Sequence, residues 1–439
     1  SDTVSDMTPQ TLKALDRRLE QFLENLLEPM GRSERRRWAR VYVHGLLLDG
    51  ERKSMEPLAA RVAGADVQAL RQFVSQSPWA VEEVQRRLAR KVVDLLREPE
   101  VWVLDETASP KAGQHSVGVA RQYCGTLGKV ANCQVAVSLH WSSAEASCPI
   151  LWRLYLPKEW LEDAERAAEV KLPPGTSCRS KTELALELLD QVLAWELPRL
   201  PVVADSFYGN DFGFRQGLRE RQLSYAVQVE PSTVVWTQDP HRPLPEPQKR
   251  GRPRRYPPLE ALPRPQDLET VAEQLPVSAW RTVAWRQGSR GIERSRFARI
   301  AVWAAHGRRK QQHPPRVAEG LLVEWPKKSQ QPAKYWLAQL GQQPVGLRRS
   351  VRIAKARWRV ELDYRELKEE LGLDHHEGRQ WLGWHHHVCL VSIACAFLRS
   401  EQARLKKNFW CDLAAGEEKA ASHTHSARGT LPLVSDSIR

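Results

Sequence analysis

The sequence predicts an α/β protein with a central mixed sheet, a helical N-terminal region and a β-containing insertion. Short apolar segments alternate with amphipathic helical segments over residues 98–229, whereas the first 97 residues have helical periodicity and the alternation stops over residues 230–347. With 439 residues, 41% of them hydrophobic, the chain can bury a large core, and its length is typical of two or three domains.

Residues 1–97 form the first predicted domain. Segments such as TLKALDRRLEQFLENLL and WAVEEVQRRLARKVVDLL have the apolar spacing of amphipathic helices, and Gly31, Gly50 and Gly64 separate the helical segments. The basic clusters SERRRWAR and GERKS could contact DNA phosphates through a helix-turn-helix, although a solvated helical face explains either cluster more simply. We expect a helical N-terminal DNA-binding domain.

Residues 98–229 have the order expected of the central sheet. VWVLD is a buried type of strand, a Gly-containing loop follows it, and KVANCQVAVSLHW and PILWRLYL are two more strands. Then come a helix at KTELALELLDQVLAWEL, the strand LPVVAD, a helix around FGFRQGLRERQ and the strand SYAVQV. Three strands, helix, strand, helix and strand is the chain order of a ribonuclease H-like core, a mixed sheet with helices on both faces.

Residues 230–347 are predicted to be an insertion domain with strands of its own, at WRTVAWR, RFARIAVWAA, LLVEW and KYWLAQL. In its segment KRGRPRRYP, the sequence around Arg250 and Arg252 spells the core of an AT-hook, whose arginines can lie in a narrow A·T minor groove. A basic, proline-rich loop is the alternative. Residues 348–413 return to the core as C-terminal helices, and residues 414–439 are expected to be a disordered tail.

The composition favours a cytoplasmic protein that binds a polyanion. The net charge of +13 and the pI near 9.5 favour nucleic acid over a membrane surface, because no lipidation signal accompanies the charge. The seven cysteines include no C-x-x-C pair, which argues against a zinc ribbon or a disulfide framework. The longest apolar run, residues 388–398, is too short to span a bilayer, and the N-terminus lacks the apolar core of a signal peptide.

A predicted helix at residues 357–372, RWRVELDYRELKEELG, holds five carboxylates. Four of them lie away from its apolar stripe and are expected to be solvated charges: Asp363, Glu366, Glu369 and Glu370. Glu361 instead borders the stripe, and its face of the helix carries three cations: Arg357, Arg365 and Lys368. An ion-pair ladder on an exposed helix explains this arrangement, and an acid that does chemistry is the alternative.

Asp105 ends the strand VWVLD and Asp205 ends the strand LPVVAD. Both carboxylates are therefore expected at the carboxyl edge of the central sheet, where open α/β folds place their ligand sites. An aspartate that ends a strand is also a common turn former or helix N-cap. Together with Glu361 on a later helix, however, the two aspartates give the order of acids that a ribonuclease H-like nuclease requires.

The chain resembles the DDE transposases of bacterial insertion sequences, closest to the insertion sequence 701 group within the insertion sequence 4 superfamily. The resemblance covers most of the chain, and its main segments are GLL..GERKS.EPLA, SPW, LDETASPKAGQHSVGVARQYCGTLGKVANCQVAVSLHW, ADSFYGNDFGFR and WLGWHHHV. In that superfamily the third acid belongs to a signature of Tyr, Arg, Glu and Lys. Arg357, Glu361 and Lys368 match its last three positions, whereas Ala354 stands where the tyrosine would be.

The resemblance implies metal-dependent cleavage of DNA at the ends of a mobile element and transfer of those ends into target DNA. It implies that Asp105, Asp205 and Glu361 are the catalytic metal ligands and that Asp105 bridges two Mg²⁺ ions, for which Mn²⁺ can substitute. Carboxylate oxygens suit Mg²⁺ better than zinc. Two such ions, about 3.5–4 Å apart, can activate the nucleophile and neutralise the leaving oxygen.

DNA contacts are expected around these acids. A guanidinium such as that of Arg357 can hold a phosphate bidentately, and an ammonium such as that of Lys368 acts as a point charge. The expected DNA-binding residues are Arg357, Lys368, Arg365, Lys111, Arg121, Lys129, Arg250 and Arg252. The partners implied are the element's terminal sequences and target DNA, with a homodimer in the complex that pairs two ends and no membrane.

Two alternatives remain. The protein could be a non-catalytic DNA-binding regulator derived from a transposase, but its intact acids favour the enzyme. It could be a ribonuclease H-like nuclease or resolvase without strand transfer, but the large insertion and the helical N-terminal domain weigh against this. The five histidines at positions 375, 376, 385, 386 and 387 lack the partnering cysteines of a zinc motif and are expected to cap, pack or contact DNA.

Overall fold

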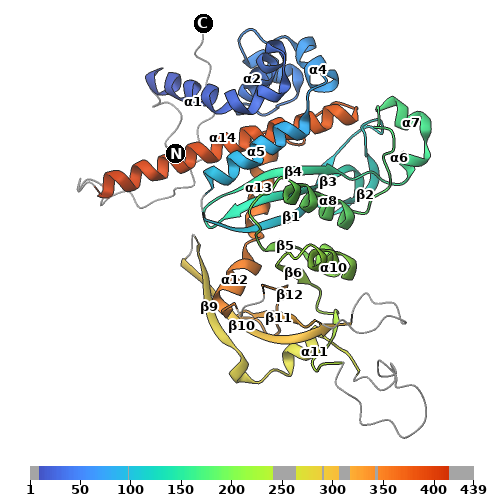
Figure 1. Cartoon of the computed structure of the whole chain (residues 1–439), viewed down its shortest axis with the longest axis vertical. Coiled ribbons are helices and arrows are strands. Elements are labelled where there is room, and N and C mark those ends of the chain that lie inside the picture. Colours follow the sequence, from blue (N-terminus) through green and yellow to red (C-terminus); the bar gives the residue numbers. More distant parts are fainter. Residues whose placement is uncertain are drawn as a thin grey trace. The chain divides into compact units, whose positions relative to one another are not determined.

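The structure is a computed structural model that describes residues 9–96, 98–240, 264–288, 291–305, 317–341 and 345–414. It confirms a mixed α/β fold with a large mixed sheet, consistent with a ribonuclease H-like core (Figure 1). The chain forms two compact units. Unit 1 comprises Ser1–Pro99, Glu106–Leu197 and Arg359–Arg439, and unit 2 comprises Glu100–Asp105 and Pro198–Trp358.

The longest helix of unit 1 is α14 (Trp381–Ala414). The others are α1 (Pro9–Leu27), α2 (Ser33–Leu47), α3 (Met55–Arg61), α4 (Val67–Gln76), α5 (Val81–Leu95), α6 (Glu159–Glu162), α7 (Ala164–Glu169), α8 (Lys181–Ala194) and α13 (Trp358–Glu369), with a 3-10 turn at Glu28–Met30. α14 packs beside α2, α4 and α5 and against the sheet of the unit (Figure 1). It is apolar on all sides because it is surrounded.

One segment of α14, Trp381–Leu405, is long and apolar enough to cross a membrane, the only such segment among the described residues. The most apolar stretch of this segment is 78% buried inside the structure. Core helices pass the same test of length and composition, and α14 has the packing of a core helix.

The strands of unit 1 form an antiparallel set around β3 (Lys129–Ser143). β2 (Ala120–Cys124) and β4 (Ser147–Leu154) pair with β3 on its two sides, and the order continues from β3 to β1 (Pro99–Pro110), a strand that both units share. The prediction of a loop over ARQYC was wrong. A turn at Gly125–Gly128 folds β2 back onto β3, and β2 alternates between exposed and less exposed residues, of which Cys124 alone is fully buried.

Unit 2 combines parallel and antiparallel strands. β1 pairs in parallel with β5 (Val202–Ala204), and β5 pairs in parallel with β6 (Tyr225–Val229). β6 then pairs with β12 (Lys334–Gln339), which leads through β11 (Glu319–Trp325) to β10 (Gly291–Ala304). The strands predicted for an insertion therefore continue the sheet of the core strands, because β12 returns to lie against β6.

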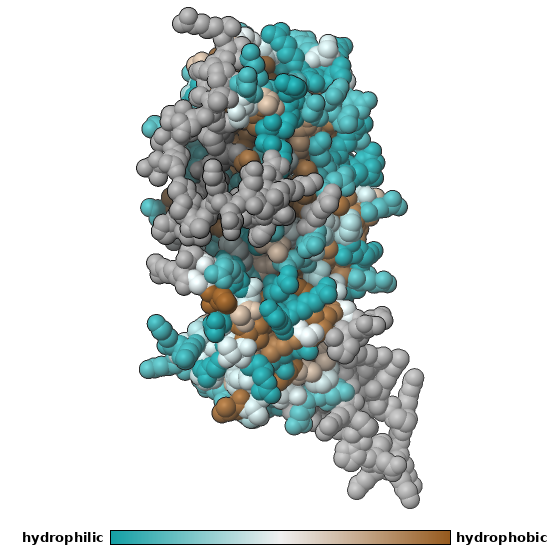
Figure 2. All heavy atoms as spheres, turned by 90° about the vertical axis from the view of Figure 1, so that its left-hand side faces the viewer, coloured by the Kyte–Doolittle hydropathy of each residue, from teal (hydrophilic) through white to brown (hydrophobic). Residues whose placement is uncertain are grey.

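The remaining elements of unit 2 cover this sheet or extend it. They are α9 (Ser206–Gly209), α10 (Phe212–Glu220), β7 (Val234–Trp236), β8 (Gln266–Asp267), α11 (Leu268–Glu273), a 3-10 turn at Val277–Ala279, β9 (Arg281–Gly288) and α12 (Leu347–Lys355). Apolar residues from β6, β7, β10, β11, β12 and α11 form one buried cluster. Among the described residues on the face shown in Figure 2, hydrophilic side chains predominate, with hydrophobic ones between them.

Candidate active site

The parallel pairing of β1 and β5 brings Asp105 and Asp205 level with each other. Trp102 lies opposite Val202 and Val103 opposite Val203, and the same register continued for two residues places Asp105 opposite Asp205. Adjacent strands lie about 4.8 Å apart. β5 ends at Ala204, so Asp205 lies just beyond the carboxyl end of its strand.

The prediction that Asp105 ends its strand was wrong, because β1 continues to Pro110. β1 lies between β3 and β5 in the sheet, and its parallel partner β5 ends at Ala204. Asp105 therefore lies level with the carboxyl end of β5, although β1 itself continues. The apolar segment VWVLD marked the part of β1 that ends level with β5 and not its full length.

Asp205 is held by the helix that follows it. Its Oδ1 atom accepts hydrogen bonds from the backbone N–H groups of Phe207, at 3.0 Å, and Tyr208, at 3.4 Å. This is an N-cap on the short helix α9. Gly209 ends that helix against β6, where an added Cβ would overlap the carbonyl oxygen of Gln228. Glycine therefore allows the close packing that fixes the turn carrying Asp205.

Asp105 is paired with Arg357. The Asp105 residue is 5% exposed, and its Oδ2 atom accepts a hydrogen bond from Arg357 Nη1 at 2.5 Å. Arg357 lies between α12 and α13, and its side chain is 23% exposed. A charge-assisted bond of this kind orients the carboxylate. Two sequence-predicted residues that are 252 positions apart along the chain are thus in direct contact.

Glu361 lies in the first turn of α13 and is exposed. It belongs to unit 1, whereas Asp105 and Asp205 belong to unit 2. Within the part of the chain that the structure describes, no three His, Cys, Asp or Glu side chains are grouped as a metal site. The two aspartates nevertheless fit a hard divalent cation, since each presents carboxylate oxygens at one sheet edge and the cap of α9 uses only Oδ1 of Asp205.

Two of the predicted DNA-binding lysines are engaged within unit 1. Lys368 Nζ donates to the Ala108 carbonyl at 2.8 Å and to Thr126 Oγ1 at 2.7 Å. Lys111 Nζ donates to the His376 carbonyl at 2.5 Å. Burial lowers the pKa of both ammonium groups. A phosphate would therefore have to compete with protein oxygens for either lysine.

The other predicted DNA-binding residues differ in their placement. Arg365 is exposed on α13, and Arg121 and Lys129 are exposed on the β2–β3 hairpin. Arg121 falls in the predicted loop after the first strand but lies within β2, whereas Lys129 begins β3, as the predicted strand KVANCQVAVSLHW does. Arg250 and Arg252, in the AT-hook segment, lie outside the described residues.

The prediction that Asp363 is a solvated charge was wrong. The residue is 3% exposed; its Oδ2 accepts from His140 Nδ1 at 2.9 Å and its Oδ1 from Arg399 Nη2 at 3.2 Å. Arg399 also pairs with Glu366, at 2.6 Å. Burial alone would raise the pKa of Asp363, but the hydrogen bond from His140 and the charge of Arg399 lower it. Residues of β3 and α14 therefore cover the face of α13 that its amphipathic pattern predicts to be exposed to solvent.

The same network continues to Ser138 and Tyr364. Ser138 Oγ lies 2.9 Å from His140 Nε2 and 2.7 Å from the Tyr364 hydroxyl. Ser, His and Asp in this order are the groups of a hydrolase triad, but Ser138 and His140 are 0% exposed, so no substrate can reach them. The sequence did hold a signal: a histidine in the apolar strand VAVSLHW and an arginine in an apolar helix require buried partners.

The late histidines are packing residues of unit 1. His387 Nε2 lies 3.1 Å from the Leu373 carbonyl and His387 Nδ1 lies 2.9 Å from the Tyr42 hydroxyl, so the ring donates to the former and accepts from the latter. His386 stacks on Trp79, with ring centroids 3.8 Å apart. Burial lowers the pKa of His386 to about 3 and that of His387 to about 4, so both rings are neutral in the folded protein.

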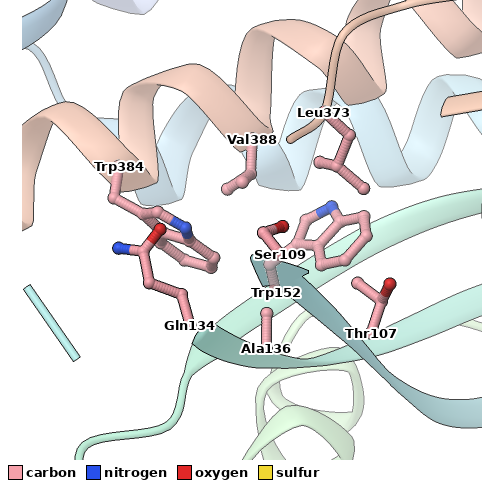
Figure 3. A pocket seen from close by; sticks show the side chains of 8 residues that line it. All are labelled: Thr107, Ser109, Gln134, Ala136, Trp152, Leu373, Trp384 and Val388. Atoms are coloured by element: carbon pink, nitrogen blue, oxygen red, sulfur yellow. The ribbon is translucent and has the colours of Figure 1, made fainter. Parts of the chain in front are cut away.

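Unit 1 also contains a small hollow, and none of the three candidate acids is among its lining residues. In Figure 3 the side chains of Trp152 and Trp384 enter the space between α14 and the strands beneath it. The residues that line it are Thr107, Ser109, Gln134, Ala136, Trp152, Leu373, Trp384 and Val388. Gln134 donates to the Val117 carbonyl and Trp152 to Ser392 Oγ, so its polar groups serve the packing of the unit.

Comparison with known proteins identifies the family of the chain. Residues 25–292 match the family described as DDE superfamily endonuclease, a segment that includes Asp105 and Asp205 and ends before Glu361. Over 198 residues the chain is 31% identical to the "Probable transposase for insertion sequence element IS701" of Microchaete diplosiphon, which covers 44% of this chain and 49% of that protein. The chain thus spans about half the length of this relative. Since the family match covers more than half of the sequence, the chain belongs to the DDE superfamily endonucleases, which generally use divalent metals.

Proposed function

We propose that this protein is a DNA transposase, which cuts DNA at the ends of an insertion sequence and joins those ends to target DNA by a cut-and-paste route. The observation that carries the proposal is the register of β1 and β5, which sets Asp105 and Asp205 side by side at one sheet edge. The similarity to a probable transposase supports the same assignment.

Asp105 and Asp205 would hold Mg²⁺, with Glu361 supplying the third carboxylate. Two bound Mg²⁺ ions, or Mn²⁺ in their place, would act as Lewis acids on the phosphodiester. The chain's own contribution is orientation. Helix α9 orients the Asp205 carboxylate through two backbone N–H groups, and the hydrogen bond from Arg357 orients that of Asp105. The Arg357 guanidinium is also suited to hold a DNA phosphate beside that carboxylate.

The partners proposed are the element's terminal sequences and target DNA, bound in the cytoplasm at the nucleoid. The net charge of +13 suits a phosphate backbone. Two ends must be held together before joining, so we propose a homodimer as the working complex. A dimer also gives each DNA end its own set of Asp105, Asp205 and Glu361.

The test is cleavage of DNA that carries the native flanks of the gene. Purified protein is incubated with this DNA in Mg²⁺, in chelator, and as the Asp205→Asn variant. Asp211→Asn is a matched control, because Asp211 caps the next helix, α10, in the same way. We expect Mg²⁺-dependent cuts at both flanks that persist in Asp211→Asn and disappear in Asp205→Asn.

Other outcomes select the alternatives. Binding to the flanks without a cut in any metal would make the protein a non-catalytic DNA-binding regulator. Metal-dependent nicking without joining of ends to a second DNA would make it a nuclease or resolvase. Equal cutting by wild type and Asp205→Asn would remove Asp205 from the site.

A further inference from the structure

The tip of the β2–β3 hairpin in unit 1 exposes a group of large apolar side chains. Tyr123 and Val130 are direct cross-strand partners, and they are 59% and 54% exposed. Leu127, in the turn between the strands, is 46% exposed. The other exposed large apolar residues of the described chain lie on other elements: Phe207, Val277, Ile292, Val317, Leu362 and Leu405.

Packing of the hairpin does not account for this group. The opposite face of the hairpin is the buried one, where Cys124 and Cys133 form an apolar cluster with Ala108 and Val135. The face that carries Tyr123 is on the solvent side, where an antiparallel pair is normally polar. Exposed apolar groups that are rimmed by polar residues commonly mark a binding surface.

The charge around the tip favours a polyanion as the partner. No Asp or Glu occurs from Thr107 to Ala144, a segment that contains Lys111, Arg121 and Lys129. Arg121 is exposed on the same face of β2 as Tyr123, and Lys129 is exposed directly after the turn. A tip with an aromatic ring, two aliphatic groups and flanking cations matches the chemistry of DNA bases between phosphates.

The turn at the tip is anchored to the helix that carries Glu361. Thr126 Oγ1 donates to the Ala108 carbonyl at 2.7 Å and accepts from Lys368 Nζ at 2.7 Å. Lys368 lies on α13, the helix with Glu361 in its first turn. The tip and this helix therefore form one fixed piece of unit 1, so DNA bound at the tip would be placed relative to Glu361.

We propose that the β2–β3 tip is a DNA wedge: Tyr123 and Val130 pack on bases that are unstacked beside the cleavage point, and Arg121 and Lys129 hold the flanking phosphates. The proposal rests on the proposed function and adds a base-contacting surface to it. Insertion of apolar side chains between bases and stacking on an aromatic ring are known ways to hold distorted DNA.

The test measures affinity for the native flank DNA over a range of salt concentrations. Tyr123→Ala should weaken binding about tenfold or more, the size typical of one lost stacking contact, with an unchanged salt dependence. Tyr123→Phe should keep the affinity. Arg121→Gln should instead reduce the slope of log affinity against log salt by about 0.7–0.9, the value for one phosphate.

A matched pair of variants controls for the loss of an exposed valine side chain. Val130→Ala should weaken binding, whereas Val277→Ala, at a residue that is 90% exposed in unit 2, should not. 2-Aminopurine placed along the flank should lose fluorescence on binding to wild type at the contacted base and keep it with Tyr123→Ala. Sedimentation of each variant reports self-association.

Affinity and quenching equal to wild type in Tyr123→Ala would overturn the proposal. So would a loss of binding that follows only from dissociation of a dimer, since the tip would then be an interface between copies. Metal-dependent cutting with no effect of Tyr123 rejects the wedge alone. Base quenching that depends on Tyr123 without any cutting rejects the transposase alone, and no binding to DNA rejects both.

Discussion

Arg357 Nη1 donates to Asp105 Oδ2 at 2.5 Å, which joins the first strand of the core to the start of the late helical region. The carboxylate side chain is 8% exposed and the arginine side chain 23% exposed. A charge in so little water needs a charged partner. The guanidinium contacts an Asp105 oxygen that we propose as a metal ligand, so a bound cation and Arg357 would compete for it.

Replacing Arg357 should therefore lower the stability of the metal-free protein and increase its stabilisation by Mg²⁺. Arg357→Ala should lower the free energy of unfolding by about 1–3 kcal/mol in chelator, because a mostly buried carboxylate loses a charged donor. Mg²⁺ should then raise the melting temperature more in the variant than in wild type. Arg352→Ala is the control, since Arg352 also pairs with an acid of β1, Glu100, but is more exposed and should cost no more than about 1 kcal/mol. Equal losses in both variants would contradict this account.

Neutralising two acids of α13 should change the free energy of unfolding by very different amounts. Asp363→Asn should cost about 3–5 kcal/mol, because it breaks a buried pair with His140 and Arg399. Glu361→Gln should change stability by less than about 0.5 kcal/mol, since the side chain is exposed. Chemical unfolding measures both. A large loss in Glu361→Gln would show that this acid is structural and would remove it from the proposed site.

The turn that carries Asp205 depends on the absence of a side chain at residue 209. Gly209→Ala should destabilise the protein by several kcal/mol and weaken metal binding, because its Cβ would overlap the Gln228 carbonyl and displace α9. Gly213→Ala, in α10, meets only Asp211 Oδ1 at 3.1 Å and should be neutral or stabilising by up to about 1 kcal/mol. Similar melting temperatures for the two variants would show that α9 tolerates displacement.

Acid should weaken the folded state through two buried histidines. Burial lowers the pKa of His386 to about 3 and of His387 to about 4 in the folded chain, whereas an unfolded histidine has a pKa of about 6.5. The unfolded chain therefore binds more protons below pH of about 6.5, and stability should fall as the pH drops from there towards about 4. Together the two residues should change the free energy of unfolding by up to about 3 kcal/mol per pH unit.

His387→Gln tests the assignment of that slope. Glutamine can donate to the Leu373 carbonyl and accept from Tyr42, as the neutral ring does, but it does not titrate. Between pH of about 6 and 4.5, the free energy of unfolding of the variant should therefore depend less steeply on pH than that of wild type, by about 1.4 kcal/mol per pH unit. An unchanged slope would assign the acid sensitivity to other groups.

The sequence predicted the fold class because the apolar segments of the core strands and the amphipathic helices carry strong periodic signals. It missed β2, whose half-exposed residues have no such signal, and it ended β1 at Asp105 because the apolar run ends there and the residues that follow, Glu106 and Thr107, are polar. The burial of Asp363 depends on β3 and α14, and no local pattern of α13 encodes it.

The site was less predictable than the fold. Strand ends pointed to Asp105 and Asp205, and their common register follows from pairing that only the tertiary structure supplies. Helical periodicity put Glu361, Arg357 and Lys368 on one face. In the structure, Arg357 bonds to Asp105 and Lys368 bonds to Thr126. Both partners come from distant parts of the chain, so the pattern of the helix alone could not predict these contacts.

The most direct measurement is binding of Mn²⁺, followed by electron paramagnetic resonance, to wild type, Asp105→Asn, Asp205→Asn and the control Asp211→Asn. The account predicts that wild type and Asp211→Asn bind Mn²⁺, that Mg²⁺ displaces it, and that either substitution at Asp105 or Asp205 weakens binding at least tenfold. Undiminished binding in both of these variants would show that the two aspartates, although level in adjacent strands, do not form a metal site.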